Sequence, residues 1–381
     1  MNLKTHRAWQ TPEITSQGRM PAHAPLCSWR SEVAARRDET SASCVSLDGQ
    51  WQFELFSRPE DVPENWPEQT QKLSTIVVPG HWQLQGFDRP IYTNVQYPFP
   101  CDPPRVPEQN STGCYLRSFS LDEDWLASQQ LRVIFDGVDS AFYLWCNDVW
   151  VGYSQDSRLP AEFDLTDHLR AGANTLKLVV LRYCDGSYLE DQDMWNLSGI
   201  YRSVTLLRKP QARITDLRVT ASLDDRYEDG VLNVRVITEG ARDCQIVLGL
   251  FDTTDLSRSV IPDTPENMGT RQIDERGGYA DRCEVTQHIA SPRAWSAEQP
   301  ALYRLTVSLL SADGQVIEVE ACDVGFRTVE IIEGQLCLNG QPLLIRGVNK
   351  HEHDPATGHF EHIADVERDL RLMKQHNFNA V

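Results

Sequence analysis

The chain has 381 residues, too many for one hydrophobic core, and at about 100 to 200 residues per domain two or three domains are expected. Hydrophobic residues make up 40% of it and charged residues 24%, which excludes a disordered or fibrous protein. The net charge of −19 opposes binding to nucleic-acid phosphates and to anionic membranes, so neither partner is expected.

The first 42 residues predict an extended arm. They are polar, contain three prolines and show the periodicity of neither helix nor strand. Trp9 and Trp29 argue against a free tail, so we expect the arm to lie on a folded domain. No apolar run of signal-peptide length occurs in the first thirty residues, and no later stretch is long enough to span a bilayer, which predicts a cytoplasmic protein.

Residues 43–209 predict a β-sandwich of the jelly-roll kind. Short stretches rich in β-branched and aromatic residues alternate with turn signals, among them WQFELF, TIVVPG, AFYLWCND and TLKLVVLRY. Most tryptophans here, notably Trp51, Trp145 and Trp150, are predicted to pack in the core, although stacking on sugar rings is the alternative.

Lys209 and Pro210 interrupt this run, and residues 210–328 predict a second, immunoglobulin-like sandwich. Its strands include ARITDLRVTAS, LNVRVITEG, CQIVLGLF and YRLTVSLL. Residues 262–282 within it are polar and too long for an ordinary hairpin loop, which indicates a functional or disordered loop.

Residues 329–381 change character and predict one unit of a parallel α/β fold. An Asn339-Gly340 hairpin precedes a buried strand, and FNAV begins another strand. Between them, helical spacing relates the apolar residues Ile363, Val366, Leu370 and Met373. A parallel sheet needs both faces covered, so we expect chain beyond Val381, or a second polypeptide, to complete the fold.

Ten cysteines are scattered along the chain without a CxxC pair. In a chain without a secretion signal, this pattern favours free thiols over disulfides and contains no zinc knuckle.

Two segments of the first sandwich carry candidate binding groups. YCDGSYLEDQDMWNLSGIYRS places Glu190, Asp191 and Asp193 next to Trp195, and carboxylates beside an aromatic ring suit sugar hydroxyls or a cation. On pattern alone, a solvated acidic loop is the favoured interpretation. RPIYTNVQYPFP offers Asn94, an amide between two tyrosines, which alone is a weak signal.

RGVNKHEHDP is a sharper candidate. His351 and His353 follow a predicted strand, with Glu352 and Asp354 beside them, where parallel α/β barrels carry their active sites. One interpretation is a histidine that donates to a substrate hydroxyl. Another is a metal-dependent hydrolase that uses His351 and His353 as ligands. A third is that the histidines only pair with the neighbouring carboxylates.

Five stretches together resemble the lac-type β-galactosidases of glycoside hydrolase family 2. They are GHWQLQGFDRPIYTNVQYPF, GYSQDSRLPAEFDLT, DGSYLEDQDMWNLSGIYR, QIDERGGYADR and PLLIRGVNKHEHDP, in the family's order. The resemblance implies a mainly β, multidomain chain: an arm (1–42), a jelly-roll sugar-binding domain (43–209), an immunoglobulin-like β-sandwich (210–328) and the truncated start of a (β/α)8 TIM barrel (329–381).

The same resemblance implies roles for individual residues. Asn94 matches a galactosyl contact, Asp193 matches an aspartate that touches the sugar and binds a sodium ion, and His351 matches a transition-state stabiliser. The loop through residues 275–278 resembles one that reaches a neighbouring subunit in tetrameric members, so the full-length protein is expected to be a homotetramer.

The family reaction is retaining hydrolysis of terminal β-D-galactosides such as lactose, by a nucleophilic glutamate and an acid/base glutamate. The resemblance puts both glutamates, the magnesium ligands and the other sodium ligands beyond Val381. Glu352 matches a non-catalytic position, so the chain alone is expected to be inactive. A non-catalytic galactoside-binding module is the alternative function, and a metal-dependent hydrolase at His351 and His353 is a further one.

Overall fold

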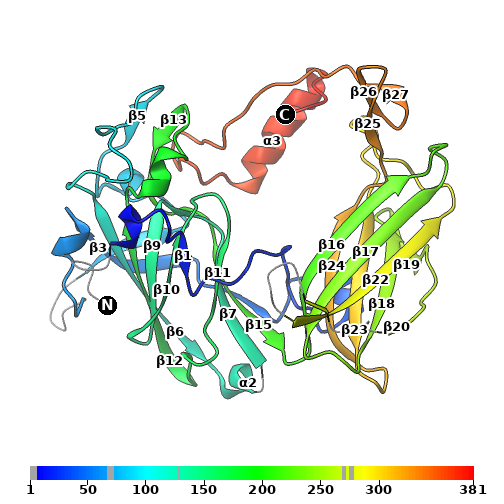
Figure 1. Ribbon diagram of the computed structural model, residues 1–381, viewed down its shortest axis with the longest axis horizontal. Helices are drawn as coiled ribbons and strands as arrows, with labels where there is room; N and C mark the ends of the chain where they lie inside the picture. Colours follow the sequence, from blue (N-terminus) through cyan, green and yellow to red (C-terminus); the bar gives the residue numbers. More distant parts are fainter. Residues whose placement is uncertain (1–6, 67–72, 128, 268–271, 274–278) are drawn as a thin grey trace. The chain divides into compact units, whose positions relative to one another are not determined.

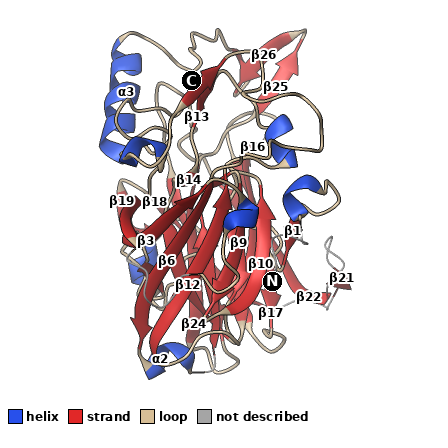
Figure 2. Ribbon diagram, turned by 90° about the vertical axis from the view of Figure 1, so that its left-hand side faces the viewer, coloured by secondary structure: helices blue, strands red, loops and turns tan. Residues whose placement is uncertain are grey.

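A computed structural model describes residues 7–66, 73–127, 129–267, 272–273 and 279–381. The chain divides into two compact units. The first unit comprises residues up to Ala22, Val45–Arg208 and His351–Glu367, and the second comprises His23–Cys44, Lys209–Lys350 and Arg368–Val381. Strands predominate in both (Figure 2), so the prediction of a mainly β, multidomain chain is confirmed.

Two antiparallel sheets dominate the first unit (Figure 1). One has the strand order β1-β10-β9-β12-β6-β3-β4, and the other has the order β11-β7-β15-β2. Two short ribbons, β13-β5 and β14-β8, accompany them. The strands are β1 (Ser16–Gln17), β2 (Cys44–Ser46), β3 (Gly49–Phe56), β4 (Ser74–Val78), β5 (Ile91–Thr93), β6 (Thr112–Leu121), β7 (Gln129–Phe135), β8 (Val138–Asp139), β9 (Ala141–Cys146), β10 (Val149–Gln155), β11 (Ala161–Asp164), β12 (Gly172–Leu181), β13 (Met194–Asn196), β14 (Gly199–Ile200) and β15 (Val204–Pro210). The helical turns are η1 (Ala8–Gln10), η2 (Pro59–Asp61), α2 (Glu123–Leu126), η3 (Gln83–Gln85) and η4 (Asp185–Tyr188).

Alternation of apolar and polar residues explains why these strands form a sandwich. In β3, Trp51 and Phe53 are buried while Gln52 between them is exposed, as the period of two in a strand requires. The largest buried cluster takes side chains from both sheets, for example Leu144 of β9 and Phe163 of β11. The core prediction is correct for Trp51. It is wrong for Trp150, which is exposed beside a register shift in β10, and Trp145 is half-buried.

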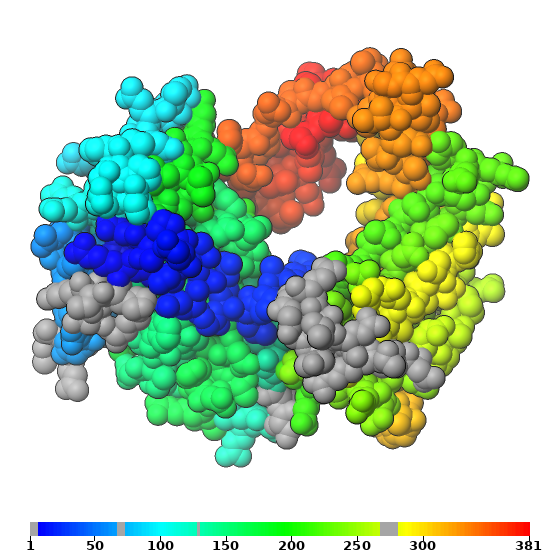
Figure 3. All heavy atoms as spheres, in the orientation of Figure 1, coloured from blue at the N-terminus to red at the C-terminus, as the bar shows by residue number. Residues whose placement is uncertain are grey.

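The arm is anchored on the first unit, as its tryptophan predicts. Trp9 is buried, and the main-chain N–H of Ala8 donates to the hydroxyl of Tyr143. Further along, β1 pairs with β10, which places Ser16 opposite Ser154. Figure 3 shows residues 7–22, in dark blue, lying across the surface of this unit.

The second unit contains the immunoglobulin-like sandwich. Its sheets have the orders β16-β17-β22-β21 and β19-β18-β23-β24, with β20 paired to β18. One core cluster lies between them and includes Leu232, Leu248, Leu305 and Phe326. The strands are β16 (Arg213–Leu223), β17 (Gly230–Glu239), β18 (Gln245–Asp252), β19 (Asp255–Ser259), β20 (Glu266–Asn267), β21 (Gln272–Ile273), β22 (Tyr279–Ile289), β23 (Tyr303–Leu310) and β24 (Val316–Val324). Residues 275–278, the segment of the predicted inter-subunit loop, lie outside the described residues.

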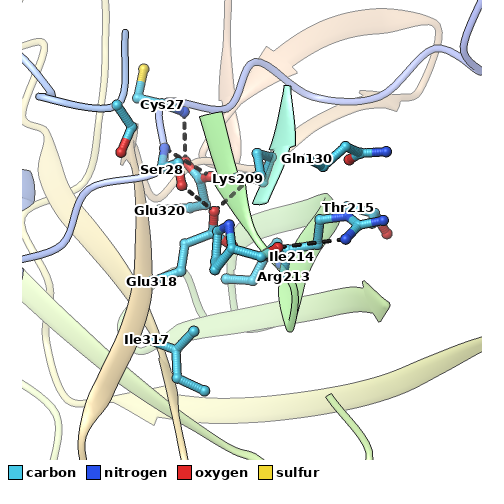
Figure 4. Close-up of polar contacts among 12 residues, drawn as sticks. Cys27, Ser28, Gln130, Lys209, Arg213, Ile214, Thr215, Ile317, Glu318 and Glu320 are labelled. Atoms are coloured by element: carbon cyan, nitrogen blue, oxygen red, sulfur yellow. Dashed lines mark hydrogen bonds and ion pairs between the residues drawn. The ribbon is translucent and has the colours of Figure 1, made fainter. Parts of the chain in front are cut away.

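A buried charged cluster holds the second part of the arm on this sandwich (Figure 4). Lys209 is fully buried, and its Nζ lies 2.9 Å from Glu318 and 2.7 Å from Glu320. Glu320 also accepts from the main-chain N–H groups of Cys27 and Ser28, at 2.7 and 3.0 Å. The lysine that interrupts the strand pattern is therefore a structural cation, because two buried carboxylates need a partner.

The segment that follows, residues 329–381, departs from one expectation. β25 (Val329–Ile332), β26 (Gln335–Leu338) and β27 (Gln341–Pro342) form a small sheet, and the Asn339-Gly340 turn has positive φ at both residues, as predicted. The predicted buried strand after it is wrong. Leu344 and Ile345 are exposed, and the regular pairing is reduced to one parallel bridge between Gly347 and Ala380.

The predicted helix is present as α3 (Ile363–Gln375), but its apolar face is not covered. None of its residues is buried, and Ile363 is 75% exposed. The parallel bridge before and after this helix gives the β-α-β order expected for one unit of a parallel fold. Besides α2 and α3, the described chain contains the α-helix α1 (Glu32–Arg36). Its N-cap residue Ser31 accepts a hydrogen bond from the N–H of Ala34.

Candidate functional site

The ribbon of β5 and β13 brings two predicted binding residues together. Antiparallel pairing places Tyr92 opposite Trp195 and Thr93 opposite Met194. Asn94 follows Thr93 and Asp193 precedes Met194, so both lie just beyond the last pair, at the same end of the ribbon. Both are exposed. The two residues, far apart in the sequence, therefore form one polar edge.

Asp193 is held by a neighbour that sequence reasoning did not assign. The hydroxyl of Tyr92 donates to Oδ1 of Asp193 at 2.5 Å, and this hydrogen bond raises the pKa of Tyr92. The Tyr92 ring also meets the Trp195 ring, with centroids 5.5 Å apart. The two residues are 50% and 42% exposed. Exposed aromatic faces beside a carboxylate and an amide are groups that bind sugar rings and their hydroxyls.

The other two carboxylates of the acidic segment have separate environments. Glu190 is partly buried and accepts hydrogen bonds from the N–H and hydroxyl of Ser157. Burial raises the pKa of Glu190, and partial burial raises that of Asp191. Only Asp193 of the three pairs with Tyr92 at the polar edge, so the segment is not one uniform acidic site.

The histidine motif lies on a less regular backbone than predicted. His351 and Glu352 are exposed, in the stretch after β27 that forms no regular strand. The Asp354 carboxylate accepts from the N–H groups of Ala356 and Thr357, and these hydrogen bonds lower its pKa. Within the described part of the chain, no group of three or more His, Cys, Asp or Glu side chains is arranged to hold a metal ion.

Residues of β13 help to line a small polar cavity that the sequence analysis did not predict. Its volume is about 40 Å³, and its lining includes Asp139, Arg158, Trp195 and His359. Burial raises the pKa of Asp139 to about 7. The lining comes from several distant segments of the first unit, so no local pattern signals it.

Two buried histidines lie together here: His359 lines the cavity, and His81 packs against His359. The main-chain N–H of His359 donates to Nε2 of His81 at 3.1 Å, and the two rings meet edge to face with centroids 5.0 Å apart. Burial lowers the pKa of each ring to about 3. Both are therefore neutral at pH 7, which lets the imidazoles pack among apolar and aromatic side chains.

Three descriptions of known protein domains match the chain in succession. Residues 44–210 match "Glycosyl hydrolases family 2, sugar binding domain", residues 212–327 match "Glycosyl hydrolases family 2", and residues 329–381 match "Glycosyl hydrolases family 2, TIM barrel domain".

Several curated proteins are similar over nearly the whole chain. A protein of Aeromonas hydrophila named beta-galactosidase is 56% identical and covers 98% of this chain. Proteins of the same name from Enterobacter cloacae and Pectobacterium atrosepticum are each 52% identical over all of it. This chain spans only 36 to 37% of the length of these relatives.

Among solved structures, the beta-glucuronidase of Bifidobacterium dentium, complexed with coumarin-3-O-glucuronide, has a TM-score of 0.71 at 21% identity. The match covers 88% of this chain and 57% of that one. The apo beta-glucuronidase of Ruminococcus gnavus has a TM-score of 0.68 at 20% identity and covers 88% of this chain and 54% of its own. These likenesses concern the fold. No described helix of the chain has both the length and the apolar character needed to cross a membrane.

Proposed function

Because this chain belongs to glycosyl hydrolase family 2, we propose that it is the N-terminal portion of a retaining β-galactosidase that acts on terminal β-D-galactosides such as lactose. The observation that carries the proposal is the polar edge formed by Asn94 and Asp193, which flank the same end of the paired strands β5 and β13. In this proposal the chain contributes substrate recognition, and the hydrolytic glutamates belong to later barrel strands.

The residues of the polar edge have complementary tasks. The Asn94 amide donates to one sugar hydroxyl and accepts from another, and the Asp193 carboxylate accepts from a third. Tyr92 acts as a positioning residue, because its hydrogen bond fixes Oδ1 of Asp193 and orients the remaining carboxylate oxygen. His351 is proposed to donate to the sugar in the transition state.

Asp193 also suits one position in a shared sodium site. Its carboxylate is exposed and offers the hard oxygen that such cations prefer. A bound sodium ion would supply positive charge next to a sugar hydroxyl. The remaining sodium ligands and the magnesium ligands are expected beyond residue 381.

Carboxylates within the chain are poor substitutes for the missing pair. A retaining enzyme needs two carboxyl groups about 5 Å apart across the scissile bond, one with a raised pKa. Burial raises the pKa of Asp139 to about 7, but Asp139 lines the cavity beside β13 and is not part of the polar edge of Asn94 and Asp193. Glu352 is exposed. We therefore propose that the 381-residue chain by itself is inactive.

Hydrolysis of nitrophenyl β-galactoside tests the proposal. The purified chain is assayed with magnesium and sodium, alone and mixed with the C-terminal portion of a curated relative. Activity only in the mixture supports the proposal, and a chain carrying Asn94→Ala should then lower it. A matched control is Asn147→Ala, since the amide of Asn147 donates to His168 and Asn174, away from the polar edge. Activity of the chain alone would contradict the proposal.

A galactoside-binding module is the second candidate function. The exposed Tyr92 and Trp195 rings favour it, because they are available for stacking on the chain's own surface. Affinity of the isolated chain for methyl β-galactoside without turnover, weakened by Trp195→Ala, would support it. Unchanged affinity in that variant would count against this role.

The location and assembly of the complete protein are also proposals. We propose a cytoplasmic homotetramer with no nucleic-acid or membrane partner. The net charge of −19 supports the last point, because it disfavours polyanions. Light scattering of the complemented mixture tests the tetramer, and a stable monomer would contradict it.

A further inference from the structure

A loop of the arm closes on itself in the second unit. The hydroxyl of Ser41 donates to the carbonyl of Ser28 at 3.3 Å, and the N–H of Cys44 donates to the carbonyl of Ser41 at 3.1 Å. The thiol of Cys44 in turn donates to the carbonyl of Cys27 at 3.5 Å. Residues 28–43, which contain α1, therefore form a compact loop whose two ends lie close together. Cys27 precedes this loop and Cys44 follows it, and we call the place where its ends meet the mouth of the loop.

The buried cluster fixes one side of this mouth. Glu320 accepts hydrogen bonds from the main-chain N–H groups of Cys27 and Ser28. The buried ammonium group of Lys209 pairs with the negative charge of Glu320. Trp29 then exchanges two main-chain hydrogen bonds with Val319, at 2.9 and 2.8 Å. Figure 4 shows the Cys27 nitrogen facing Glu320 and its sulfur directed away from the carboxylates. The Cys27 sulfur thus has a defined position on the side away from the charged cluster.

The two thiols differ in acidity, which gives them different roles. A hydrogen bond from the Cys44 thiol lowers the pKa of Cys27, and the charge of Lys209 acts in the same direction, while burial, Glu320 and Asp38 oppose them. Donation to Cys27 and burial raise the pKa of Cys44. Because the thiolate is the reactive form and the Cys44 thiol keeps its proton on the Cys27 carbonyl, we assign the attack to Cys27 and the resolving step to Cys44.

We infer that Cys27 and Cys44 form a modification site, a dithiol that a low-molecular-weight disulfide such as oxidised glutathione converts into an intramolecular disulfide. The Cys27 thiolate attacks one glutathione sulfur, and one glutathione leaves as its thiolate. Cys44 then loses its proton to solvent and attacks the Cys27 sulfur, which releases the second glutathione thiolate. The two cysteines lose two electrons and two protons, and one glutathione disulfide becomes two glutathione thiols.

The other cysteines set this pair apart. All ten are free thiols, and five are buried: Cys114, Cys146, Cys184, Cys283 and Cys337. Burial raises the pKa of Cys114, Cys146, Cys184 and Cys283, which makes these thiols unreactive. Cys27 and Cys44 are both partly exposed and hydrogen bonded to one another. Oxidation would close the loop of residues 28–43 covalently, so its two ends would stay together when their hydrogen bonds open.

The test uses the wild-type chain, reduced, freed of reductant and incubated with oxidised glutathione. Trypsin cuts within the loop, so a Cys27–Cys44 disulfide joins the peptides of residues 20–30 and 38–72. Mass spectrometry without reductant should find these peptides linked, and dithiothreitol should separate them. The folded chain should form the link at least about tenfold faster than the chain in guanidinium chloride.

Two variants separate the pair from general thiol reactivity. Cys44→Ser should stop at a glutathione adduct on Cys27, whereas Cys244→Ser, which removes another partly exposed thiol, should give the wild-type link. Because the link is mapped in the wild-type chain, a variant that fails to fold leaves the test intact. A wild-type chain that stops at the Cys27 adduct, that links other cysteines, or that reacts no faster folded than unfolded overturns the inference.

Discussion

The two β-sandwiches and the helix α3 of the segment 329–381 all carry apolar patterns, yet they differ in burial. Leu144 and Leu305 in the sandwiches are fully buried, while Ile363 and Leu370 in α3 are 75% and 46% exposed. An antiparallel sandwich pairs consecutive strands and covers one sheet with the other, so its chain segment suffices. A parallel β-α-β unit needs further strands and helices beside it. Periodicity thus predicts an element, whereas burial depends on a second surface.

Hydrogen exchange should show the largest difference between the two regions. Amides of β23, in the middle of a sheet, are expected to exchange through global unfolding at a cost of about 5 kcal/mol or more, and those of α3 through local opening at about 1 kcal/mol or less. Mass spectrometry of peptides from residues 303–310 and 363–376 measures both. Strong protection of residues 363–376 in the monomer would break the comparison.

Removing the buried cation should cause the next largest effect. Lys209→Met leaves Glu318 and Glu320 as buried unpaired carboxylates, which should destabilise the second unit by about 3 to 5 kcal/mol. Lys374→Met is the control, because Lys374 pairs with Glu298 on the surface and should change stability by less than about 1 kcal/mol. Calorimetry reports the unfolding. Adding Glu318→Gln and Glu320→Gln should restore part of the loss, and equal stability of both lysine variants would refute the role of the cluster.

Matched leucine truncations sharpen the comparison directly. Leu305→Ala empties a buried position in β23 and should lower the free energy of unfolding by about 3 kcal/mol. Leu370→Ala removes an exposed side chain from α3, and since alanine favours helices, the change should stay within about 0.5 kcal/mol. Urea unfolding monitored by circular dichroism compares the two. Similar losses would mean that α3 packs on a surface as the sandwiches do.

The first unit should lose stability in acid through its buried histidines. The pKa of His359 is about 3 in the folded unit and about 6.5 unfolded, so the unfolded chain binds more protons at pH 5. Stability therefore falls as the pH drops below 6.5, by about 2 kcal/mol per histidine at pH 5. Between pH 7.5 and 5, the His359→Asn variant should therefore lose about 2 kcal/mol less stability than the wild type. Tryptophan fluorescence is the readout, because eight of the ten tryptophans belong to this unit.

Asp139 supplies a control of opposite sign. Its pKa is raised to about 7 in the folded unit, so the folded state binds the extra proton between about pH 4 and 7 and gains stability as the pH falls. Asp139→Asn should therefore steepen the acid loss that His359→Asn relieves. Parallel pH profiles for the two variants would contradict both assignments.

The smallest expected effect concerns the polar edge. Tyr92→Phe removes one hydrogen bond to Asp193, worth about 1 kcal/mol, and should raise KM for nitrophenyl β-galactoside several-fold in the complemented mixture with a smaller change in kcat. Tyr97→Phe is the control, because its hydroxyl donates to the main chain of Tyr188 instead. A loss confined to kcat would argue against a positioning role for Tyr92.

Much of the fold was predictable because it depends on local patterns. The alternation around Trp51 marks β3, the Asn339-Gly340 pair marks its hairpin, and the spacing from Ile363 marks α3. Asn94 is a weak candidate by pattern, and the role predicted for it rests on resemblance to a family. The support of Asp193 by Tyr92 was not predictable, because that contact depends on the register of two distant strands.

The sequence by itself determined the order of the elements, the division into two sandwiches and a parallel unit, and the family. Tertiary structure alone decided that Asn94 and Asp193 flank the same end of a paired ribbon, that Lys209, at the boundary of the two units, is a buried cation, and that the thiol of Cys44 reaches the main chain of Cys27. The reason is physical. Secondary structure follows from the periodicity of neighbouring side chains, whereas burial, charge pairing and thiol contact depend on residues that only folding brings together.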